Sequence, residues 1–442
     1  MTSRAILILS IVSMLLSGGC GPHEHEHVHL RNWEAASPDP DRIFLTFLGD
    51  PSSSRAVTWR TDSSIGTAFA EVAAATGYPT FSDSARRINA STETLDLNQA
   101  SMNRQGTVNY HSVILDELQP DTLYAYRVGD GDKYWSEWIQ FRTAAATNEP
   151  FSFVYFGDAQ NGVLSHWSRN IRMAYQTAPD ASFVIHAGDL VTDGHSDLLW
   201  AEWHKAGGWI HSQWTGVPVL GNHELRHLNT ETQDGKVVAL QWRPQFTLPE
   251  VKGLPEELIE TVYSVDYQGL RIIVLDSMRY QEEQEVFLES ELKRPGAKWT
   301  VVTSHYSIFS GREGRDFEPG RIGWKTIMDR YGVDLVLQGH DHLYARGQVP
   351  VRMTDDSFGD SFQTLYVTSV SGVKMYEISQ EQLNSYTEDG YSNDSTAAGQ
   401  QFFQVIHVDG NTLSYNAYTA DGILYDSAEI TKNPQTGKKT IR

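Results

Sequence analysis

The sequence contains a single cysteine, Cys20, so no disulfide can form within the chain. The same shortage of thiols argues against a structural zinc site built from cysteines. The fold must therefore rest on hydrophobic burial, and a chain with 40% apolar and 11% aromatic residues can supply it. At 442 residues, the chain is expected to divide into two domains.

Positive charge is also scarce. The chain has 35 Lys and Arg residues against 56 Asp and Glu residues, and its net charge is −21. This balance opposes binding to polyanions, so no nucleic-acid polymer is expected as a partner. A small phosphorylated substrate stays open as a partner, because bound divalent cations would dominate the field at a local site.

The apolar run near the N-terminus is too short to cross a membrane. Ile6 to Leu16 would measure ~16 Å as a helix, against a hydrocarbon core of ~30 Å. Arg4 precedes the run and Ser17-Gly18-Gly19-Cys20 follows it, a pattern that resembles a secretion signal ending in a bacterial lipobox. We expect residues 1–20 to be a signal peptide and Cys20 to carry the lipid of an exported, membrane-anchored lipoprotein. The alternative is an incidental thiol in a discarded leader.

Histidines alternate with acidic residues directly after this signal. Such a tract can bind metal loosely or can serve only as a solvated tether, and both interpretations remain open for residues 21–37. The histidines concerned are His23, His25, His27 and His29.

Residues 38–145 predict a small antiparallel β-sandwich. Short alternating segments such as Ile43 to Phe47 and Ala56 to Arg60 are separated by turn residues such as Gly129-Asp130-Gly131-Asp132. No candidate catalytic cluster falls in this range. The small, polar, proline-terminated stretch from Thr143 to Pro150 predicts the domain boundary.

From residue 150 to residue 442 the pattern changes. Apolar runs now alternate with segments of helix length, which is typical of buried strands in an α/β domain. Farther on, strand-like segments return, with Asp409-Gly410-Asn411 as a hairpin turn. The polar stretch from Glu381 to Gln400 predicts a loop.

Polar side chains follow five of the apolar runs, at the point where each strand should end. Strand ends of this kind are where ligands bind in α/β sheets, and carboxylate, amide and imidazole groups suit Mn, Fe or Zn. His340 and His342 would point to opposite faces of a regular strand, but on a turn after Gly339 they can converge. The five clusters are Asp158 with Gln160, Asp189, Asn222 with His223 and Glu224, His305, and His340 with Asp341 and His342.

The motifs GDAQ, GDLV, GNHE, VTSH and GHDHLYAR, in this order, resemble those of the calcineurin-like metallophosphoesterases and specifically of the purple acid phosphatases. The segments VTWRTD and LDELQPDTLYAYRVGDGDKYWSEWIQFRT are similar to that family's fibronectin-type-III-like N-terminal domain. The resemblance runs from about Asp41 to about Lys432. It implies an α/β four-layer sandwich (α-β-β-α), with two central sheets flanked by helices, after the N-terminal all-β sandwich.

Carried over residue by residue, the resemblance implies two divalent metal ions. Asp158, Asp189 and His342 would hold one ion; Asn222, His305 and His340 would hold the other; Asp189 would bridge them, and His223 would act as a catalytic residue at the substrate. Two such ions can activate a water molecule for in-line attack at phosphorus. The implied reaction is hydrolysis of phosphate monoesters, with diesters or pyrophosphates as the alternative. A catalytically silent surface lipoprotein that binds a partner is the alternative from another class.

Three departures from the family pattern affect the expected chemistry. Thr192 stands where purple enzymes have a tyrosine, so we expect no purple colour. Gln160 can supply a neutral metal ligand instead, which favours divalent Mn, Fe or Zn over trivalent iron; alternatively, its amide only hydrogen-bonds a neighbouring loop. Arg312 and Arg315 stand near the position of a second substrate histidine, where they would either bind phosphate or lie in a solvated loop.

Overall fold

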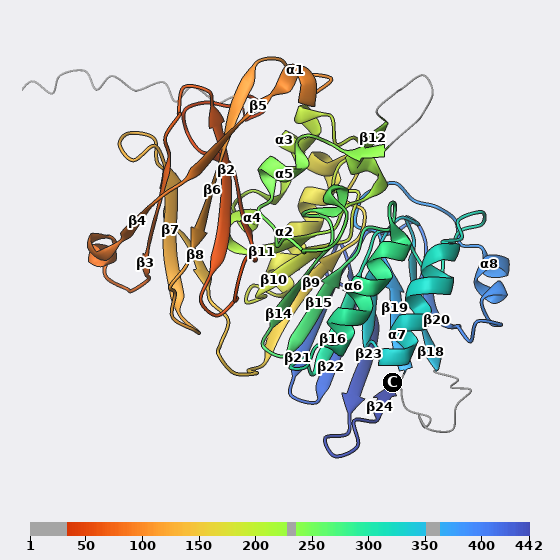
Figure 1. Ribbon diagram of the computed structural model, residues 1–442. Coiled ribbons are helices and arrows are strands. Elements are labelled where there is room, and N and C mark those ends of the chain that lie inside the picture. Colours follow the sequence, from red (N-terminus) through yellow and green to blue (C-terminus); the bar gives the residue numbers. More distant parts are fainter. Residues whose placement is uncertain (1–32, 228–235, 351–362) are drawn as a thin grey trace, which may run out of the picture. The chain divides into compact units, whose positions relative to one another are not determined.

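A computed structural model describes residues 33–227, 236–350 and 363–442 (Figure 1). Cys20 and the four alternating histidines after it lie outside the described residues. Of the described residues, Glu34–Arg442 form one compact unit. No helix in the described part of the chain is long and apolar enough to cross a membrane.

The first part of this unit is rich in strands, as the sequence predicts. One four-stranded sheet has the order β4-β3-β7-β8, and its apolar side chains pack against those of β1, β2 and β6; Val57 and Trp59 meet Val72, Tyr126 and Phe141 in this core. A short helix, α1 (Leu97–Ala100), follows β5. The strands are β1 (Asp41–Thr46), β2 (Arg55–Asp62), β3 (Phe69–Ala74), β4 (Arg86–Asn89), β5 (Ser91–Asp96), β6 (Thr107–Leu115), β7 (Leu123–Gly129) and β8 (Ile139–Arg142).

The first large sheet has 11 strands in the order β24-β23-β22-β21-β9-β10-β11-β1-β2-β6-β5. Its β9, β10 and β11 are parallel neighbours. Strand β1 joins the sheet by parallel pairing with β11, where Leu45 lies opposite Thr215. The sheet therefore runs without interruption from the β-rich part into the α/β part. The strands after β8 are β9 (Phe151–Phe156), β10 (Phe183–His186), β11 (Thr215–Pro218), β21 (Phe402–Asp409), β22 (Thr412–Thr419), β23 (Leu424–Lys432) and β24 (Lys439–Ile441).

The second large sheet has seven strands in the order β14-β15-β16-β17-β19-β18-β20, and β15, β16, β17 and β19 are parallel. A separate short hairpin joins β12 (Leu225–His227) to β13 (Lys236–Val238). The seven strands are β14 (Tyr263–Tyr267), β15 (Leu270–Val274), β16 (Trp299–Thr303), β17 (Leu335–Gln338), β18 (Tyr344–Pro350), β19 (Gln363–Thr368) and β20 (Ser392–Ala397).

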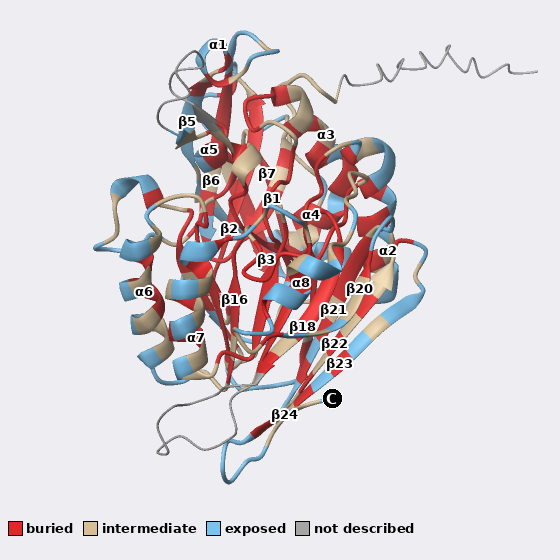
Figure 2. Ribbon diagram, turned by 90° about the vertical axis from the view of Figure 1, so that its right-hand side faces the viewer, coloured by how far each residue is buried: buried red, intermediate tan, exposed pale blue. Residues whose placement is uncertain are grey.

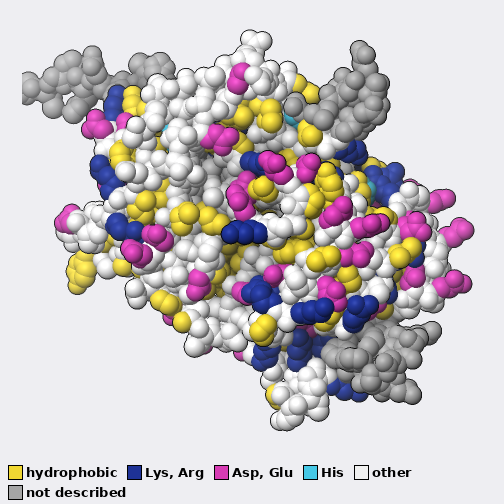
Figure 3. Space-filling model, viewed as in Figure 1, with side chains coloured by type: hydrophobic (Ala, Val, Ile, Leu, Met, Phe, Trp, Pro, Cys, Tyr) yellow, Lys and Arg dark blue, Asp and Glu magenta, His cyan; other side chains and the backbone are white. Residues whose placement is uncertain are grey.

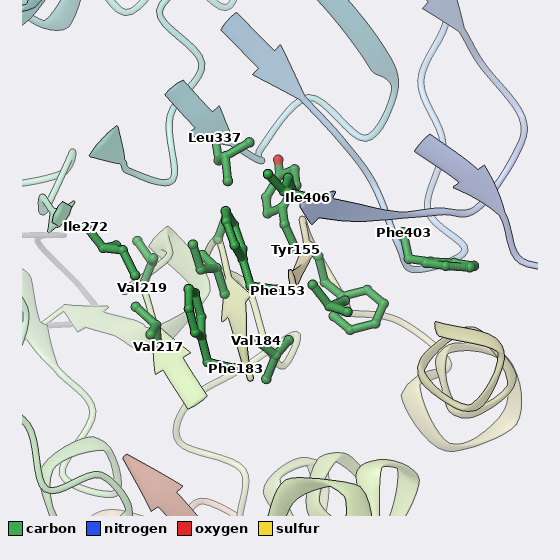
Figure 4. Packing of buried hydrophobic residues seen from close by; sticks show 14 of the residues in the cluster. Phe153, Tyr155, Phe183, Val184, Val217, Val219, Ile272, Leu337, Phe403 and Ile406 are labelled. Carbon is green, nitrogen blue, oxygen red and sulfur yellow. The ribbon is translucent and has the colours of Figure 1, made fainter. Parts of the chain in front are cut away.

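The two large sheets face each other across one hydrophobic core. Figure 4 shows Phe183 and Val217 of the first sheet near Ile272, and Tyr155 near Leu337. Successive side chains of a strand point to opposite faces, so Ile273, next to Ile272, belongs to a different core that the helices cover. Strands buried on both faces are what the uninterrupted apolar runs predict.

Helices cover the outer faces of both sheets (Figures 1 and 2). Helix α2 (Ser168–Thr177) packs against β21 of the first sheet and buries Ile171 and Ala174. Helix α6 (Gln281–Lys293) buries Phe287 and Leu288 in the core that also contains Ile273 of the second sheet, here called the second core. The prediction of an α-β-β-α sandwich is confirmed. The remaining α-helices of the described residues are α3 (Asp197–Gly207), α4 (Trp209–Gln213), α5 (Trp242–Gln245), α7 (Lys325–Tyr331) and α8 (Gln380–Ser385).

The prediction of a loop from Glu381 to Gln400 is wrong. This stretch contains most of α8 and all of β20, which pairs with β18. Three buried side chains explain why this stretch forms regular structure. Leu383, Tyr386 and Tyr391 lie in the second core, where Tyr391 stacks on Phe309 with ring centroids 4.2 Å apart. The hairpin predicted at Asp409-Gly410-Asn411 is confirmed between β21 and β22.

A buried ion cluster ties the β-rich part to the α/β part. Asp197, at the start of α3, lies 2.9 Å from Arg42 and 3.4 Å from Arg60, and the side chains of all three are at most 2% exposed. Arg60 also contacts the half-buried Asp41 at 2.7 Å. The charges of two buried guanidinium groups in the β-rich part are thus balanced in part by one carboxylate of the α/β part.

We predict that Asp197→Asn destabilises the whole unit by about 3–5 kcal/mol, because it leaves buried cations without a full counter-charge. Urea unfolding followed by circular dichroism measures this change. Asp180→Asn is the matched control, since Asp180 is exposed and forms no ion pair with another described residue. Equal stability of both variants would show that the cluster contributes nothing.

Candidate metal centre

The candidate ligands follow strands of both large sheets. Asp158 and Asp189 follow β9 and β10, which are parallel neighbours in the first sheet. His305 and His340 follow β16 and β17, which are parallel neighbours in the second. Because the carboxyl ends of parallel strands meet at one edge of a sheet, the two edges bring these side chains together.

Two groups of potential metal ligands share one carboxylate. Asp158, Asp189 and His342 form one group, and Asp189, His305 and His340 form the other; within each group the ligand atoms all lie within 4.8 Å of one another. Asn222 joins the second group, since its Oδ1 lies 3.2 Å from His305 Nε2. The six residues that the sequence predicts as ligands therefore converge, with Asp189 between the two groups.

The backbone at these positions is strained. Asp158, Asp189, His340 and His342 have φ values of 31°, 49°, 74° and 51°, a region that costs non-glycine residues roughly 1–3 kcal/mol each. Such strain persists where the surroundings enforce it, and it clusters at functional sites. It also turns His340 and His342 off the regular strand geometry, so that each reaches a different group of ligands.

Gly188 is required by the same geometry. Its φ of 84° favours glycine, and a Cβ atom there would meet the ring of His305 at 2.5 Å. The backbone before Asp189 can thus lie directly against an imidazole of the other sheet.

Backbone carbonyl groups orient two of the histidines. Nδ1 of His305 donates to the carbonyl oxygen of Ala187 at 2.9 Å, and Nδ1 of His342 donates to that of Lys374 at 3.1 Å. In the neutral ring, each bond leaves the lone pair of Nε2 facing the carboxylates. This is the tautomer that a metal-binding histidine needs.

The two central carboxylates are buried without a lysine or arginine of the described residues to balance them. Asp158 and Asp189 are 0% and 1% exposed, and neither pairs with a Lys or Arg among the described residues. Burial raises the pKa of Asp158 well above its usual value. Burial opposes ionisation of Asp189 as well, but the charge of His305 outweighs it and the pKa of Asp189 is lowered.

Burial and the nearby charges shift the pKa values of two histidines in opposite directions. Burial lowers the pKa of His342 to about 3, and the nearby Lys374 acts in the same direction, so the imidazole is neutral at ordinary pH. Burial also disfavours protonation of His305, but the charge of Asp189 outweighs it and raises the pKa of His305 to about 9. The centre therefore attracts positive charge, as a cation site should.

Gln160 lies inside the first group. It is fully buried, and its Nε2 lies 2.7 Å from Asp189 Oδ2 and 3.1 Å from His342 Nε2, while its Oε1 has no hydrogen-bond partner. Rotation of the amide by half a turn exchanges the two atoms and directs Oε1 at the same position. The side chain is thus placed to reach an ion held by Asp158, Asp189 and His342.

His223 lies at the rim of the centre. Its side chain is 29% exposed, and its Nε2 lies 3.9 Å from Asp189 Oδ2. Nδ1 bonds to the carbonyl oxygen of Thr192, which leaves Nε2 facing the centre. The hydroxyl of Thr192 accepts a bond from the backbone N–H of Asn161 at 3.1 Å.

The two predicted arginines lie beside the centre. Arg315 donates to the carbonyl oxygen of His340, and the guanidinium of Arg312 lies 3.4 Å from the ring centroid of Tyr376. Both side chains are half-buried. Asp341, between the two histidines, accepts a bond from the backbone N–H of Gly311 at 3.0 Å and so holds the start of this loop against the centre.

Glu224 is a positioning residue to which the sequence motifs assigned no role. Its fully buried carboxylate accepts bonds from the backbone N–H groups of Asp189, Leu190 and Gly221 at 3.1, 2.8 and 2.8 Å, and from Val191 at 3.3 Å. Burial raises the pKa of Glu224 to about 8, and the charge of Asp189 adds to this effect. A charged residue directly after His223 in an apolar setting is the signal that could have revealed it.

Comparison with known proteins agrees with this geometry. Residues 40–143 match the family model "Purple acid Phosphatase, N-terminal domain", and residues 151–344 match "Calcineurin-like phosphoesterase". The chain is 28% identical over 358 residues to probable purple acid phosphatase 20 of Arabidopsis thaliana, covering 77% of each protein. It is 26% identical over 273 residues to probable inactive purple acid phosphatase 1 of the same plant, covering 53% of this chain and 43% of that relative.

A solved structure shares the fold. A purple acid phosphatase from yellow lupin (Lupinus luteus) seeds superposes with a TM-score of 0.71 at 20% identity, covering 90% of this chain and 75% of the lupin chain. The two family models and this neighbour define a calcineurin-like phosphoesterase with an N-terminal β-rich domain. The chain belongs to the purple acid phosphatase-like members of that class, a family of phosphoric ester hydrolases.

We predict that Glu224→Ala lowers metal affinity roughly 10–100-fold, because four buried N–H groups lose their acceptor and the Asp189 turn loses its support. Isothermal titration with Mn²⁺ measures the affinity. Glu224→Gln is the matched variant: it keeps one acceptor oxygen and should fall between Ala and the parent. Parent-like affinity in the Ala variant would show that Glu224 does not support the metal site.

Proposed function

We propose that the protein is a dinuclear metal-dependent phosphoesterase that hydrolyses phosphate monoesters. One observation carries the proposal: two buried groups of ligands share the carboxylate of Asp189. A single ion would need only one of the groups. A shared carboxylate is the natural bridge between two ions a few ångströms apart.

The donor set fits two divalent ions. Oxygen and nitrogen donors without a thiolate suit Mn, Fe or Zn, and the Oδ1 atom of Asp158 is buried without a partner. Asp158, Asp189 and His342 would hold one ion, with Gln160 beside it; Asn222, His305 and His340 would hold the other, with Asp189 between them. When bound, such ions activate a water molecule and neutralise charge on the phosphoryl oxygens.

His223 would handle protons or charge at the substrate. Its bond to the carbonyl of Thr192 fixes the ring, so that a proton on Nε2 points at the space above the two groups. From there it can donate a hydrogen bond to a phosphoryl oxygen or a proton to the leaving group. Its partial exposure gives a substrate access to that atom.

Two alternatives compete with this proposal. Phosphodiesters or pyrophosphates use the same chemistry, so the metal centre alone does not separate them from monoesters. A silent surface lipoprotein has support from the relative named as probably inactive. The complete set of six candidate ligands, five of them held at strained or buried positions, favours an active enzyme. The proposal also keeps residues 38–145 as a domain without hydrolytic groups, with the boundary at 143–150.

We predict that Asn222→Ala and His340→Ala abolish hydrolysis of 4-nitrophenyl phosphate and lower bound metal, because each removes a ligand. His223→Ala should keep both ions and lose roughly 10²–10⁴-fold in kcat. Metal analysis of the purified variants, together with turnover, separates the two cases.

His407→Ala is the control for these variants, since His407 is exposed on β21 and bonds only to Ser152 among the described side chains. The His407→Ala variant should hydrolyse 4-nitrophenyl phosphate with the kcat of the parent. Unchanged turnover after loss of Asn222 or His340 would contradict the two-metal assignment, and loss of metal from His223→Ala would mean that this histidine is itself a ligand.

The metals should be divalent and the protein should not be purple. Thr192 supplies no phenolate, and the neutral amide of Gln160 compensates a trivalent ion less well than an anionic ligand would. We predict no strong visible tyrosinate-to-iron band in active protein, and a lower metal affinity in Gln160→Ala. A strong band would refute the first expectation. Undiminished affinity would mean that Gln160 only hydrogen-bonds its neighbours.

We further propose that the protein is exported and anchored through a lipid on Cys20, on the strength of the lipobox-like sequence alone. Cys20→Ser should move the protein from the membrane fraction to the soluble fraction of the periplasm or medium. Immunoblotting of the fractions tests this. Equal retention in the membrane would point to an uncleaved leader or to another anchor.

A further inference from the structure

Three cationic side chains surround one tyrosine next to the metal centre. The ring centroid of Tyr376 lies 3.4 Å from the guanidinium carbon of Arg312, 5.1 Å from that of Arg315 and 5.5 Å from Nζ of Lys374. All four side chains are half-buried. We refer to Arg312, Arg315, Lys374 and Tyr376 as the basic cluster.

The basic cluster directly adjoins the candidate ligands. The rings of Tyr376 and His342 meet edge to face with centroids 5.0 Å apart, and the backbone N–H of Tyr376 donates to the carbonyl oxygen of His342 at 3.0 Å. Arg315 reaches the carbonyl oxygen of His340, and the carbonyl oxygen of Lys374 orients His342. The cluster and the metal centre are thus parts of one surface.

None of the three cations of the basic cluster forms an ion pair with an Asp or Glu of the described residues, whereas Arg321 and Arg346 do. Two acidic residues close by in the chain or the site have other partners: Asp341 bonds to the backbone N–H of Gly311, and Asp316 pairs with Arg321. Three unpaired like charges stand out in a chain of net charge −21, whose acidic side chains are spread over the face in Figure 3.

Cations that repel one another in a half-buried position are stabilised when an anion binds among them. The aromatic face of Tyr376 offsets part of the repulsion. Arg315 bonds to the carbonyl oxygen of His340, and Arg312 and Lys374 bond to the side chain of Tyr376. Each of the three cations has further N–H donors that a bound anion can accept from. The metal ions would already balance the negative charge of the phosphoryl group to be cleaved. A monoester with a neutral leaving group would therefore need none of these additional donors.

We propose that the basic cluster is a second anion-binding subsite, which selects substrates carrying a further phosphate or carboxylate on the leaving group. This inference rests on the proposed phosphoesterase function and refines its substrate class. A planar guanidinium recognises either anion in a bidentate manner, so phosphate and carboxylate share the required chemistry. Simple monoesters with uncharged leaving groups would be the poorer substrates.

The test compares substrates that differ in one charge. The ratio of kcat/KM for 4-carboxyphenyl phosphate to kcat/KM for phenyl phosphate measures selection of a carboxylate, and the corresponding ratio for inorganic pyrophosphate measures selection of a phosphate. We expect Lys374→Gln and Arg312→Gln to lower the ratio roughly 10–100-fold for whichever anion is the natural one, the loss expected for one charge-assisted hydrogen bond. Lys374→Arg should restore most of it.

Arg330→Gln is the matched control, because Arg330 is an exposed arginine on α7 that pairs with Glu289; it should leave both ratios unchanged. Ratios that stay at the parent value in both Lys374→Gln and Arg312→Gln would overturn the inference while the hydrolase proposal stands.

A binding measurement separates failure of the subsite from failure of the hydrolase. Calorimetry with the metal-loaded protein compares methylenebisphosphonate with methylphosphonate, neither of which is hydrolysed. A preference for the bisphosphonate that Lys374→Gln reduces at least tenfold would support the subsite even if no ester were turned over. Equal affinities in the parent, or a preference that both Gln variants retain, would exclude a phosphate subsite; parent-like selection of 4-carboxyphenyl phosphate in both Gln variants would exclude a carboxylate subsite.

Discussion

The structure is organised around two buried carboxylates that no lysine or arginine of the described residues neutralises. Asp158 and Asp189 lie side by side under the ends of two parallel strands, and burial of two like charges is costly without compensation. The neutral imidazole of His342 and the hydrogen bonds of Glu224 help to hold the Asp189 turn in place, and among the described side chains only His305 offers Asp189 a compensating charge. Bound cations would supply the missing charge, and for this reason the centre is best understood as a metal site.

This arrangement depends on the packing of the two large sheets. Asp158, Asp189 and Asn222 come from the first sheet, whereas His305, His340 and His342 come from the second. Neither sheet alone forms a complete group of ligands. The shared hydrophobic core, in which Phe183 and Val217 face Ile272, therefore sets the distance between the ligands as well as contributing stability. The positive φ values at four of these positions are maintained by the same packing.

The sequence was most informative where one physical rule acts locally. A polar side chain after a buried apolar run marks the edge of a parallel sheet, and this rule predicts Asp158, Asp189, His305 and His340 at strand ends, where the structure shows them close together. The same rule puts Glu224 in one of the clusters, but its bonds to the backbone at Asp189 and Leu190 depend on the fold and cannot be predicted from the rule. Lys374 and Tyr376 lie several residues beyond the strand of residues 363–368, so the rule does not single them out, although they adjoin the same site.

Other features could not be read from the sequence because they depend on distant partners. The pairing of β1 with β11 joins two segments that sequence patterns separate into different domains. Helix α8 and strand β20 lie in a mostly polar stretch, and the buried side chains of Leu383, Tyr386 and Tyr391, in α8 and between the two elements, order it. In both cases tertiary contact outweighs local pattern.

Asp189 should lie between the two metal ions when they are bound. A crystal structure of the protein grown with Mn²⁺, with anomalous differences recorded at the manganese edge, would show whether it does. We predict two anomalous peaks per chain, about 3.5–4 Å apart, with an oxygen of Asp189 bound to both ions, Asp158 and His342 at one ion, and Asn222, His305 and His340 at the other. A single peak, or two peaks of which only one contacts Asp189, would contradict it.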